Sequence, residues 1–351
     1  MPLFYPSHDI ALAHGVKHFN PPAAALRLQE DLAYLYEIWN QPFLNHETSI
    51  PIPWGWDWDT RDFIHKKYDV KMTQLPTDEE LEMIRQLSSR KTTIQLLETL
   101  KERAQNWELG SEFILDAPIP QYLDSEDKLW NFITSHDAEG KAFVLKTPWS
   151  SSGRGLHVSK TKTLNGLVVD NTRTIMMKQA LGTIHKMEGI MGEDWIENKV
   201  QDFAMLFYAS DEEVKFIGYS LFDNDESTNG TTYRQGYLTS NDNIIHSLSV
   251  PENVLAMIAK TYEEILTDIL QPFFGKPWHL GYVGIDMMTY HEHNYDADQR
   301  LKIQPCIELN LRCTMGVVCR LWYEQNQMEG LFKITPMLQN GHFKAEFLPT
   351  E

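Results

Sequence analysis

The chain has few cysteines and no long apolar run. Its 351 residues contain three cysteines, Cys306, Cys313 and Cys319, in no CxxC-type pair. Neither a disulfide framework nor a structural zinc site is therefore expected, and the cysteines are predicted to be reduced and buried. No apolar stretch approaches the ~18 residues that span a bilayer. The opening MPLFYPSHDI also lacks the basic and apolar regions of a signal peptide, so we expect a soluble, cytoplasmic protein without membrane partners.

Basic residues are also scarce. The chain has 31 Lys and Arg against 49 Asp and Glu, a formal net charge of −18. Such a surface repels nucleic acid, so no nucleic-acid partner is expected, and any phosphate ligand must be held by a local basic cluster. A hydrophobic content of 42% excludes a disordered chain. The length exceeds the roughly 100–200 residues of one domain and predicts two or three units.

Several common motifs are absent. The chain has no GxxxxGK[ST] phosphate loop, no GxGxxG strand–helix turn, no GxSxG nucleophile elbow and no HRD and DFG kinase motifs. These absences exclude the commonest other nucleotide-binding folds and the serine hydrolases. Its thirteen histidines stand mainly near turns, where surface or structural roles are commoner than metal ligation. No histidine is therefore assigned as a ligand.

Hydrophobic periodicity predicts a series of helices. One begins at Pro21-Pro22 and continues to Ile38, and residues 77–104 are helical with a break near Ser88. A third helix covers residues 252–270. Between the first two, residues 51–59 read as a rigid loop whose three tryptophans could form a ligand lip, although aromatic packing around a turn is favoured.

Short apolar runs predict strands at residues 143–146, 156–158, 203–208 and 216–220. Residues 223–243 are polar and rich in Asn, Thr, Ser and Gly, which predicts a mobile loop. Arg234 in that loop either reaches a substrate or is solvated. A hairpin of residues 281–288 and 301–310 is the last organised block expected.

The chain reverses its charge between Gly140 and Met187. Eight basic residues and a single acid, Asp170, lie in this segment. Its centre coincides with the Ser/Gly loop 150–155, where small residues let backbone N–H groups approach an anion. The loop could therefore bind a polyphosphate. The alternative is an ordinary solvent-exposed turn, which has the same composition.

A second set of polar residues lies on the predicted hairpin. If the two strands pair so that Asp286 lies opposite Glu308, the midpoint of the hairpin falls inside its polar tip, which makes this register plausible. Glu308 and Asn310 are two residues apart and therefore share one face of their strand. Oxygen ligands at this spacing suit Mg²⁺ bridged to phosphates. The alternative is a set of solvated strand charges, which the apolar flanks of Asp286 disfavour.

Together these features resemble the ATP-grasp superfamily over roughly residues 85–320. The matching segments are Arg90-Lys91-Thr92-Thr93, the strand lysine of Phe143-Val-Leu-Lys146, the loop 150–155, Trp195-Ile-Glu197-Asn-Lys-Val200, Gly284-Ile-Asp286 and Glu308-Leu-Asn310-Leu-Arg312. The last resembles the Glu-x-Asn-x-Arg form of carboxylate–amine ligases.

The resemblance implies a mixed α/β (α+β) chain with a nucleotide cleft between two α+β subdomains. These would be residues 116–200 and 201–351, preceded by a small N-terminal α/β domain, 1–115. It also implies the site residues. Catalytic roles fall to Arg312 and Lys146, metal ligation to Asp286, Glu308 and Asn310, and ATP binding to Lys91, Lys146, Ser151, Ser152, Gly153, Arg154, Gly155, Glu197, Val200 and Asp202.

The implied activity is an ATP- and Mg²⁺-dependent ligase with small-molecule carboxylate and amine substrates. ATP phosphorylates the carboxylate, and the amine then displaces phosphate from the acylphosphate. Two alternatives share these residues. An ATP-grasp kinase would phosphorylate a hydroxyl group and stop, and a nucleotide-binding protein without turnover would use the same cleft.

Overall fold

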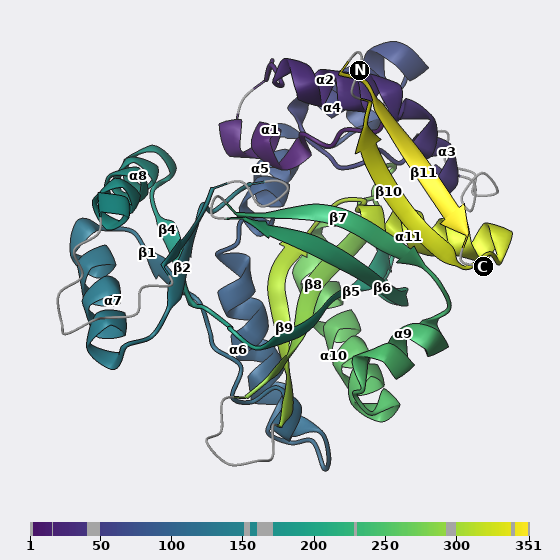
Figure 1. The fold of residues 1–351 in the computed structure, drawn as a ribbon. Coiled ribbons are helices and arrows are strands. Elements are labelled where there is room, and N and C mark those ends of the chain that lie inside the picture. The colour runs from purple at the N-terminus through teal and green to yellow at the C-terminus, as the bar shows by residue number, and fades with distance from the viewer. Residues whose placement is uncertain are drawn as a thin grey trace.

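The computed structural model of the chain describes residues 3–15, 17–40, 50–150, 155–159, 171–227, 230–292, 300–337 and 341–349. These residues form two antiparallel sheets and the helices that cover them (Figure 1). The predicted mixed α/β class is thus confirmed.

The smaller sheet has the strand order β1-β4-β2-β3. Its strands are β1 (Gln121–Leu123), β2 (Phe143–Lys146), β3 (Leu156–Ser159) and β4 (Ile190–Asp194). Helices α7 (Glu126–Glu139) and α8 (Asn171–Met187) lie on its outer side, away from the larger sheet (Figure 1). Apolar side chains of both helices and of the sheet form a separate small core, so this unit has its own hydrophobic centre.

The larger sheet has the order β11-β10-β7-β6-β5-β8-β9. Its strands are β5 (Lys199–Ala209), β6 (Val214–Ser227), β7 (Gly230–Leu238), β8 (Gly281–His291), β9 (Leu301–Asn310), β10 (Gly330–Pro336) and β11 (Phe343–Pro349). The predicted strands at 203–208 and 216–220 are confirmed as parts of β5 and β6, and the predicted hairpin is confirmed as β8 and β9.

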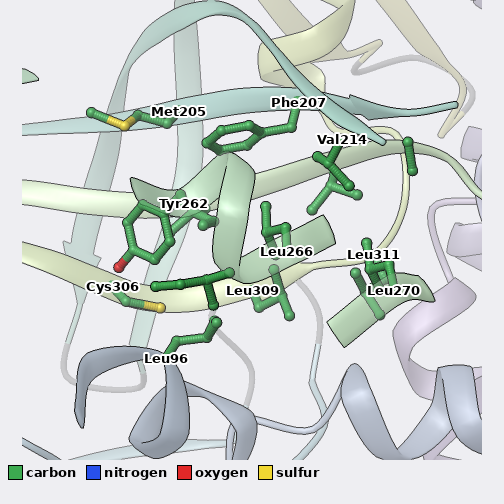
Figure 2. Close-up of a cluster of buried hydrophobic side chains, with 14 of the residues drawn as sticks. Leu96, Met205, Phe207, Val214, Tyr262, Leu266, Leu270, Cys306, Leu309 and Leu311 are labelled. Atoms are coloured by element: carbon green, nitrogen blue, oxygen red, sulfur yellow. The ribbon is translucent and has the colours of Figure 1, made fainter. Parts of the chain in front are cut away.

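Alternation along the strands separates a core face from a polar face. Phe203, Met205 and Phe207 are fully buried, and they pack toward helix α10 (Glu252–Leu270), whose Tyr262 lies close to Phe207. Figure 2 shows Phe207, Tyr262 and Leu266 in one cluster with Leu309 of β9. Because side chains alternate across a strand, Asp202 and Ala204 point to the opposite face, where the candidate site lies.

The segment 223–243 is not a loop, contrary to the sequence prediction. It completes β6, forms β7 and enters helix α9 (Asn241–Leu248). One cluster of its described polar side chains is paired across the hairpin: the Asp223 carboxylate accepts hydrogen bonds from Arg234, Gln235 and Tyr237. Composition predicted a turn-rich loop, but β-propensity depends on the environment of a strand, and here the pairing satisfies the polar groups.

The described part of residues 3–115 holds only helical elements, where an α/β unit was expected. The elements are α1 (His8–His14), α2 (Ala23–Asp31), η1 (Ala33–Leu35), α3 (Tyr36–Asn40), α4 (Trp58–Tyr68), η3 (Met72–Gln74), α5 (Asp78–Leu87), α6 (Thr92–Ala104) and η4 (Ser111–Phe113). The predicted break near Ser88 is confirmed, whereas the helix expected through Ile38 is interrupted at Leu32. Trp54 and Trp56 are buried, so the tryptophan loop packs inward.

The chain continues past the hairpin that was expected to be the last organised block. Helix α11 (Met315–Asn326) follows β9, and a 3₁₀ turn, η5 (Gln271–Phe273), ends α10. β10 and β11 then extend the large sheet beside α2 (Figure 1). Cys306, Cys313 and Cys319 are buried and free, as predicted. Among the described helices, none combines the length and apolar character needed to cross a membrane.

Candidate active site

A cavity of about 310 Å³ lies between the two sheets. Lys146 and Glu193 line it from the small sheet, and Asp286 and Glu308 line it from the large one. Residues far apart in the sequence thus meet at one place. Of the residues predicted for the site, Lys146, Asp202, Asp286, Glu308, Asn310 and Arg312 all line this cavity.

Lys146 ends strand β2 with its charge on the cavity side. Its Nζ lies 2.5 Å from the Glu193 carboxylate on β4, and the two side chains are only 12% and 13% exposed. A buried charge without a partner would be costly, so Glu193 holds the ammonium group in place. Sequence reasoning missed Glu193, since its partnership depends on the β2–β4 pairing.

Arg90 is the basic residue that the N-terminal helices bring to the cavity. It is 5% exposed, and its Nη1 donates to Thr147 O and Ser150 Oγ, both at 2.8 Å. Its Nη2 lies 2.8 Å from the Glu308 carboxylate. The guanidinium therefore connects the β8–β9 hairpin to the start of the Ser/Gly loop.

Lys91, the predicted nucleotide ligand, is not brought into this cavity. It precedes helix α6, and its Nζ lies 4.6 Å from the centre of the Tyr122 ring on a separate groove. Neighbouring residues at a helix start point in different directions, so Arg90 faces the site and Lys91 faces away. The residue before the predicted one, Arg90, is thus the one that lines the cavity.

The predicted loop residues Ser151, Ser152, Gly153 and Arg154 lie outside the described residues. Gly155, at the end of that loop, is described and has a φ of +73°. Its carbonyl accepts a hydrogen bond from Thr147 N at 3.1 Å. A Cβ at this position would lie 2.7 Å from Thr147 Oγ1, so glycine is required both by the backbone and by the close contact.

The β8–β9 hairpin has the register that the sequence predicted. Asp286 lies opposite Glu308, and Asn310 pairs with Gly284 two residues along. Burial and the neighbouring Glu308 raise the pKa of Asp286 to about 7, although the charge of Arg312 and a hydrogen bond from Asn310 act in the opposite direction. The two carboxylates thus repel each other, and a cation between them would relieve that repulsion.

The donor set fits Mg²⁺ better than a transition metal. Asp286, Glu308 and Asn310 offer only oxygen ligands, and Mg²⁺ is commonly held by one or two carboxylates together with substrate phosphates. No group of three or more His, Cys, Asp or Glu side chains in the described part of the chain could hold a metal alone. Phosphate oxygens would therefore have to complete the coordination.

The connection between the sheets provides the opposite wall of the cavity. Trp195 and Ile196 line it, together with Asp202 at the start of β5. The Asp202 carboxylate is buried, and it accepts from Lys199 Nζ at 3.0 Å and from Asn224 Nδ2 at 3.1 Å. Among the described residues, neither Glu197 nor Val200 belongs to the lining, and Val200 is exposed.

Arg312 has a partner that the sequence did not reveal. Asp9 of helix α1 faces it side-on, with Nε–Oδ1 and Nη2–Oδ2 distances of 2.8 and 2.7 Å. Burial disfavours both charges, yet the interaction holds the pKa of Asp9 below its ordinary value and that of Arg312 above its own. The separation of 303 residues left no sequence signal for this contact.

We expect Asp9→Asn to lower the free energy of unfolding by about 3 kcal/mol, because it leaves the Arg312 charge buried without its partner. Chemical denaturation followed by tryptophan fluorescence measures this change. Asp268→Asn is the matched control, since its ion pair with Arg103 is exposed and should contribute less than about 1 kcal/mol. Equal losses in the two variants would show that the Asp9–Arg312 pair has no special structural role.

A scan of protein-family models finds no match to this chain, and neither does a search of curated proteins. Solved structures do show similarity. An N5-carboxyaminoimidazole ribonucleotide synthetase, purK, in complex with ADP is 16% identical with a TM-score of 0.40, over 74% of this chain and 52% of the other. A biotin carboxylase from Campylobacter jejuni in a β-γ-ATP complex is 13% identical with a TM-score of 0.43, over 82% and 58%.

A third similar structure is D-alanyl-alanine synthetase A from Vibrio cholerae, 11% identical with a TM-score of 0.38, over 70% of this chain and 62% of the other. The chain thus spans between about half and three-fifths of the length of these proteins. Because all three likenesses are weak, the function is argued below from the residues of this chain.

Proposed function

We propose that the chain is an ATP-grasp ligase that uses Mg·ATP to activate a substrate carboxylate for attack by an amine. One observation supports this most strongly. Asp286, Glu308 and Asn310 converge across one cavity from Lys146 and Arg90. Oxygen ligands for a hard cation therefore face cationic side chains, as the binding of a metal-bound polyphosphate requires.

The cationic residues would bind and orient the phosphates. Lys146 is held by Glu193, and Arg90 is held by Thr147 and Ser150, so neither side chain has to be ordered when the nucleotide enters. Catalysis of phosphoryl transfer consists largely of such positioning and charge stabilisation. In this proposal Arg90 takes the place that the sequence motif gave to Lys91.

The remaining residues divide the other tasks. Asp286, Glu308 and Asn310 would hold Mg²⁺, which supplies positive charge to the phosphates. Asp202 lies on the wall formed by the interdomain connection and would bind the ribose hydroxyls. Arg312 lies next to the carboxylate pair and would stabilise negative charge on the acyl group. The cleft would thus form between residues 116–200 and 201–351, with residues 1–115 contributing Arg90 and Asp9.

Hydroxylamine trapping tests this function. A panel of carboxylic acids, including amino acids and small peptides, is incubated with the protein, Mg·ATP and hydroxylamine, which reacts with an acylphosphate to give a hydroxamate and phosphate. We expect ADP and hydroxamate in equal amounts for at least one acid, and neither product without Mg²⁺. A kinase would instead release ADP with a hydroxyl substrate and form no hydroxamate. Absence of hydroxamate across the panel would contradict the ligase.

A further inference from the structure

The rim segment, residues 147–150, directly follows strand β2 and borders the candidate active site. Lys146 precedes this segment and Ser150 ends it, and both of these residues line the cavity. Among the described residues, the small sheet bonds only to its start, where Thr147 N donates to Gly155 O at 3.1 Å. The position of the rest of the rim segment therefore depends on contacts with other elements.

The turn between helices α5 and α6 supplies the first of these contacts. Arg90 lies in this turn, and its backbone N–H donates to Pro148 O at 2.8 Å. Its guanidinium also donates to Thr147 O and to Ser150 Oγ. A single residue of the N-terminal helices thus holds the rim segment through both its backbone and its side chain.

Trp149 provides a second attachment of the rim segment. Its Nε1 donates to Arg85 O at 2.9 Å, and the Arg85 guanidinium carbon lies 4.5 Å from the centre of its ring. A guanidinium in this position is attracted to the face of the indole. Trp149 lines a separate groove and does not belong to the lining of the active-site cavity. It would therefore act on a bound nucleotide only through its neighbour Ser150.

Arg85 is itself held by two other contacts. Its Nε donates to Leu12 O of helix α1 at 2.8 Å, and its Nη1 donates to the Glu82 carboxylate at 2.9 Å. The Arg85 side chain is 19% exposed, and Leu12 is fully buried. Because a guanidinium is planar and presents its N–H groups in a rigid fork, these bonds fix the face that lies over Trp149. The attachment of the rim segment thus ends in the interior of the N-terminal helices.

We propose that Arg85 and Trp149 are positioning residues for the nucleotide phosphates, because they fix the rim segment before ATP enters. The inference rests on the proposed function, which places phosphates beside Ser150 and Arg90. Binding groups that are already ordered lose less entropy when a ligand arrives. A loosened rim segment should therefore bind ATP more weakly, although no contact with ATP is removed. Residues 1–115 would then contribute to nucleotide binding through more than Arg90.

Calorimetric titration of Trp149→Phe with ATP and Mg²⁺ tests this role. Phenylalanine keeps a ring beneath Arg85 but loses the bond to Arg85 O, so we expect the ATP affinity to fall about three- to tenfold, the effect of one hydrogen bond. Trp56→Phe is the matched control, since it loses the bond from Trp56 Nε1 to His279 O at 2.7 Å, outside the cavity lining. It should keep the wild-type affinity. Wild-type affinity in Trp149→Phe, or equal losses in both variants, would overturn the proposal.

A double variant tests whether Arg85 acts through Trp149. Arg85→Met removes the guanidinium but leaves the carbonyl that accepts from Trp149, and it should weaken ATP binding about threefold. In the Trp149→Leu variant the ring beneath the guanidinium is gone, so adding Arg85→Met should weaken binding no further. Arg103→Met removes an arginine of α6 that pairs with Glu264 and should leave the affinity unchanged. The same loss from Arg85→Met with and without Trp149 would refute the role of Arg85.

Hydrogen exchange without nucleotide separates this inference from the proposed function. The Arg90 N–H group bonds to Pro148 O, so its exchange rate reports how firmly the rim segment is attached. We expect faster exchange at Arg90 in Trp149→Phe and no change in Trp56→Phe. If the wild type binds ATP but Trp149→Phe changes neither exchange nor affinity, the positioning role is wrong and the nucleotide site stands. If the wild type binds no ATP, the proposed function fails and the phosphate role of the two residues fails with it.

Discussion

Glu308→Gln is expected to reduce ATP-dependent turnover by at least ~100-fold while the protein remains folded. Glutamine keeps the shape of the side chain but removes one of the two carboxylate charges that would hold Mg²⁺ in the proposed site. It also removes the repulsion acting on Asp286, so the pKa of Asp286 should fall, and this relief offsets part of the stability lost when Arg90 loses its ion pair with Glu308. Arg90 keeps its bonds to Thr147 and Ser150 in this variant. Steady-state ADP release, measured with an acid identified by hydroxylamine trapping, gives the turnover, and thermal unfolding gives the stability.

Glu292→Gln is the matched control for this variant. Glu292 directly follows β8 of the same hairpin but lies outside the cavity lining, with its carboxylate 3.9 Å from Lys302. Its activity should stay within about twofold of the wild type, because Glu292 is partly exposed and Lys302 keeps its closer ion pair with Asp116 at 2.8 Å. Full activity in Glu308→Gln would show that Glu308 is an ordinary strand residue and would remove the metal assignment.

Lys146→Met is the second variant with a large expected effect. The substitution keeps an unbranched apolar chain but removes the charge proposed to bind the phosphates. We expect ATP affinity to fall ~10–100-fold, the range for hydrogen bonds to charged groups. Calorimetric titration of ATP in the presence of Mg²⁺ measures this loss. Lys141→Met removes an exposed lysine paired with Glu139 and should not change the affinity.

A double variant separates nucleotide binding from simple loss of the ion pair. Lys146→Met leaves Glu193 as an uncompensated, largely buried carboxylate, which should destabilise the fold by about 3 kcal/mol. Adding Glu193→Gln should restore most of that stability without restoring ATP binding. If the double variant regains wild-type affinity, then Lys146 does not contact the nucleotide and serves only as the partner of Glu193.

The sequence predicted the parts of this molecule that depend on local pattern or on spacing. The register of Asp286 and Glu308 followed from the length of the hairpin and its polar tip, and helix α10 followed from its apolar period. Lys146 followed from its place at the end of an apolar strand. In each case the residues that decide the structure are close together in the chain, so their pattern is visible.

Contacts between distant segments left no such pattern. Asp9 of helix α1 meets Arg312, two residues after the end of β9, only through tertiary structure, and Glu193 meets Lys146 only through strand pairing. The β6–β7 hairpin was predicted as a loop because its segment is polar and rich in Asn, Thr, Ser and Gly, and Asn and Gly are uncommon in strands. Its residues become strands because β5 and β10 supply partners on both sides and the polar side chains bond to one another.

The most direct test of the account is calorimetric titration of the unmodified protein with ATP, once with Mg²⁺ and once with a chelator in its place. The site is built from paired carboxylates that repel each other and from cations suited to phosphate. We therefore expect one ATP bound per chain with Mg²⁺ and much weaker binding without it. Absence of ATP binding in the presence of Mg²⁺ would contradict the proposed function.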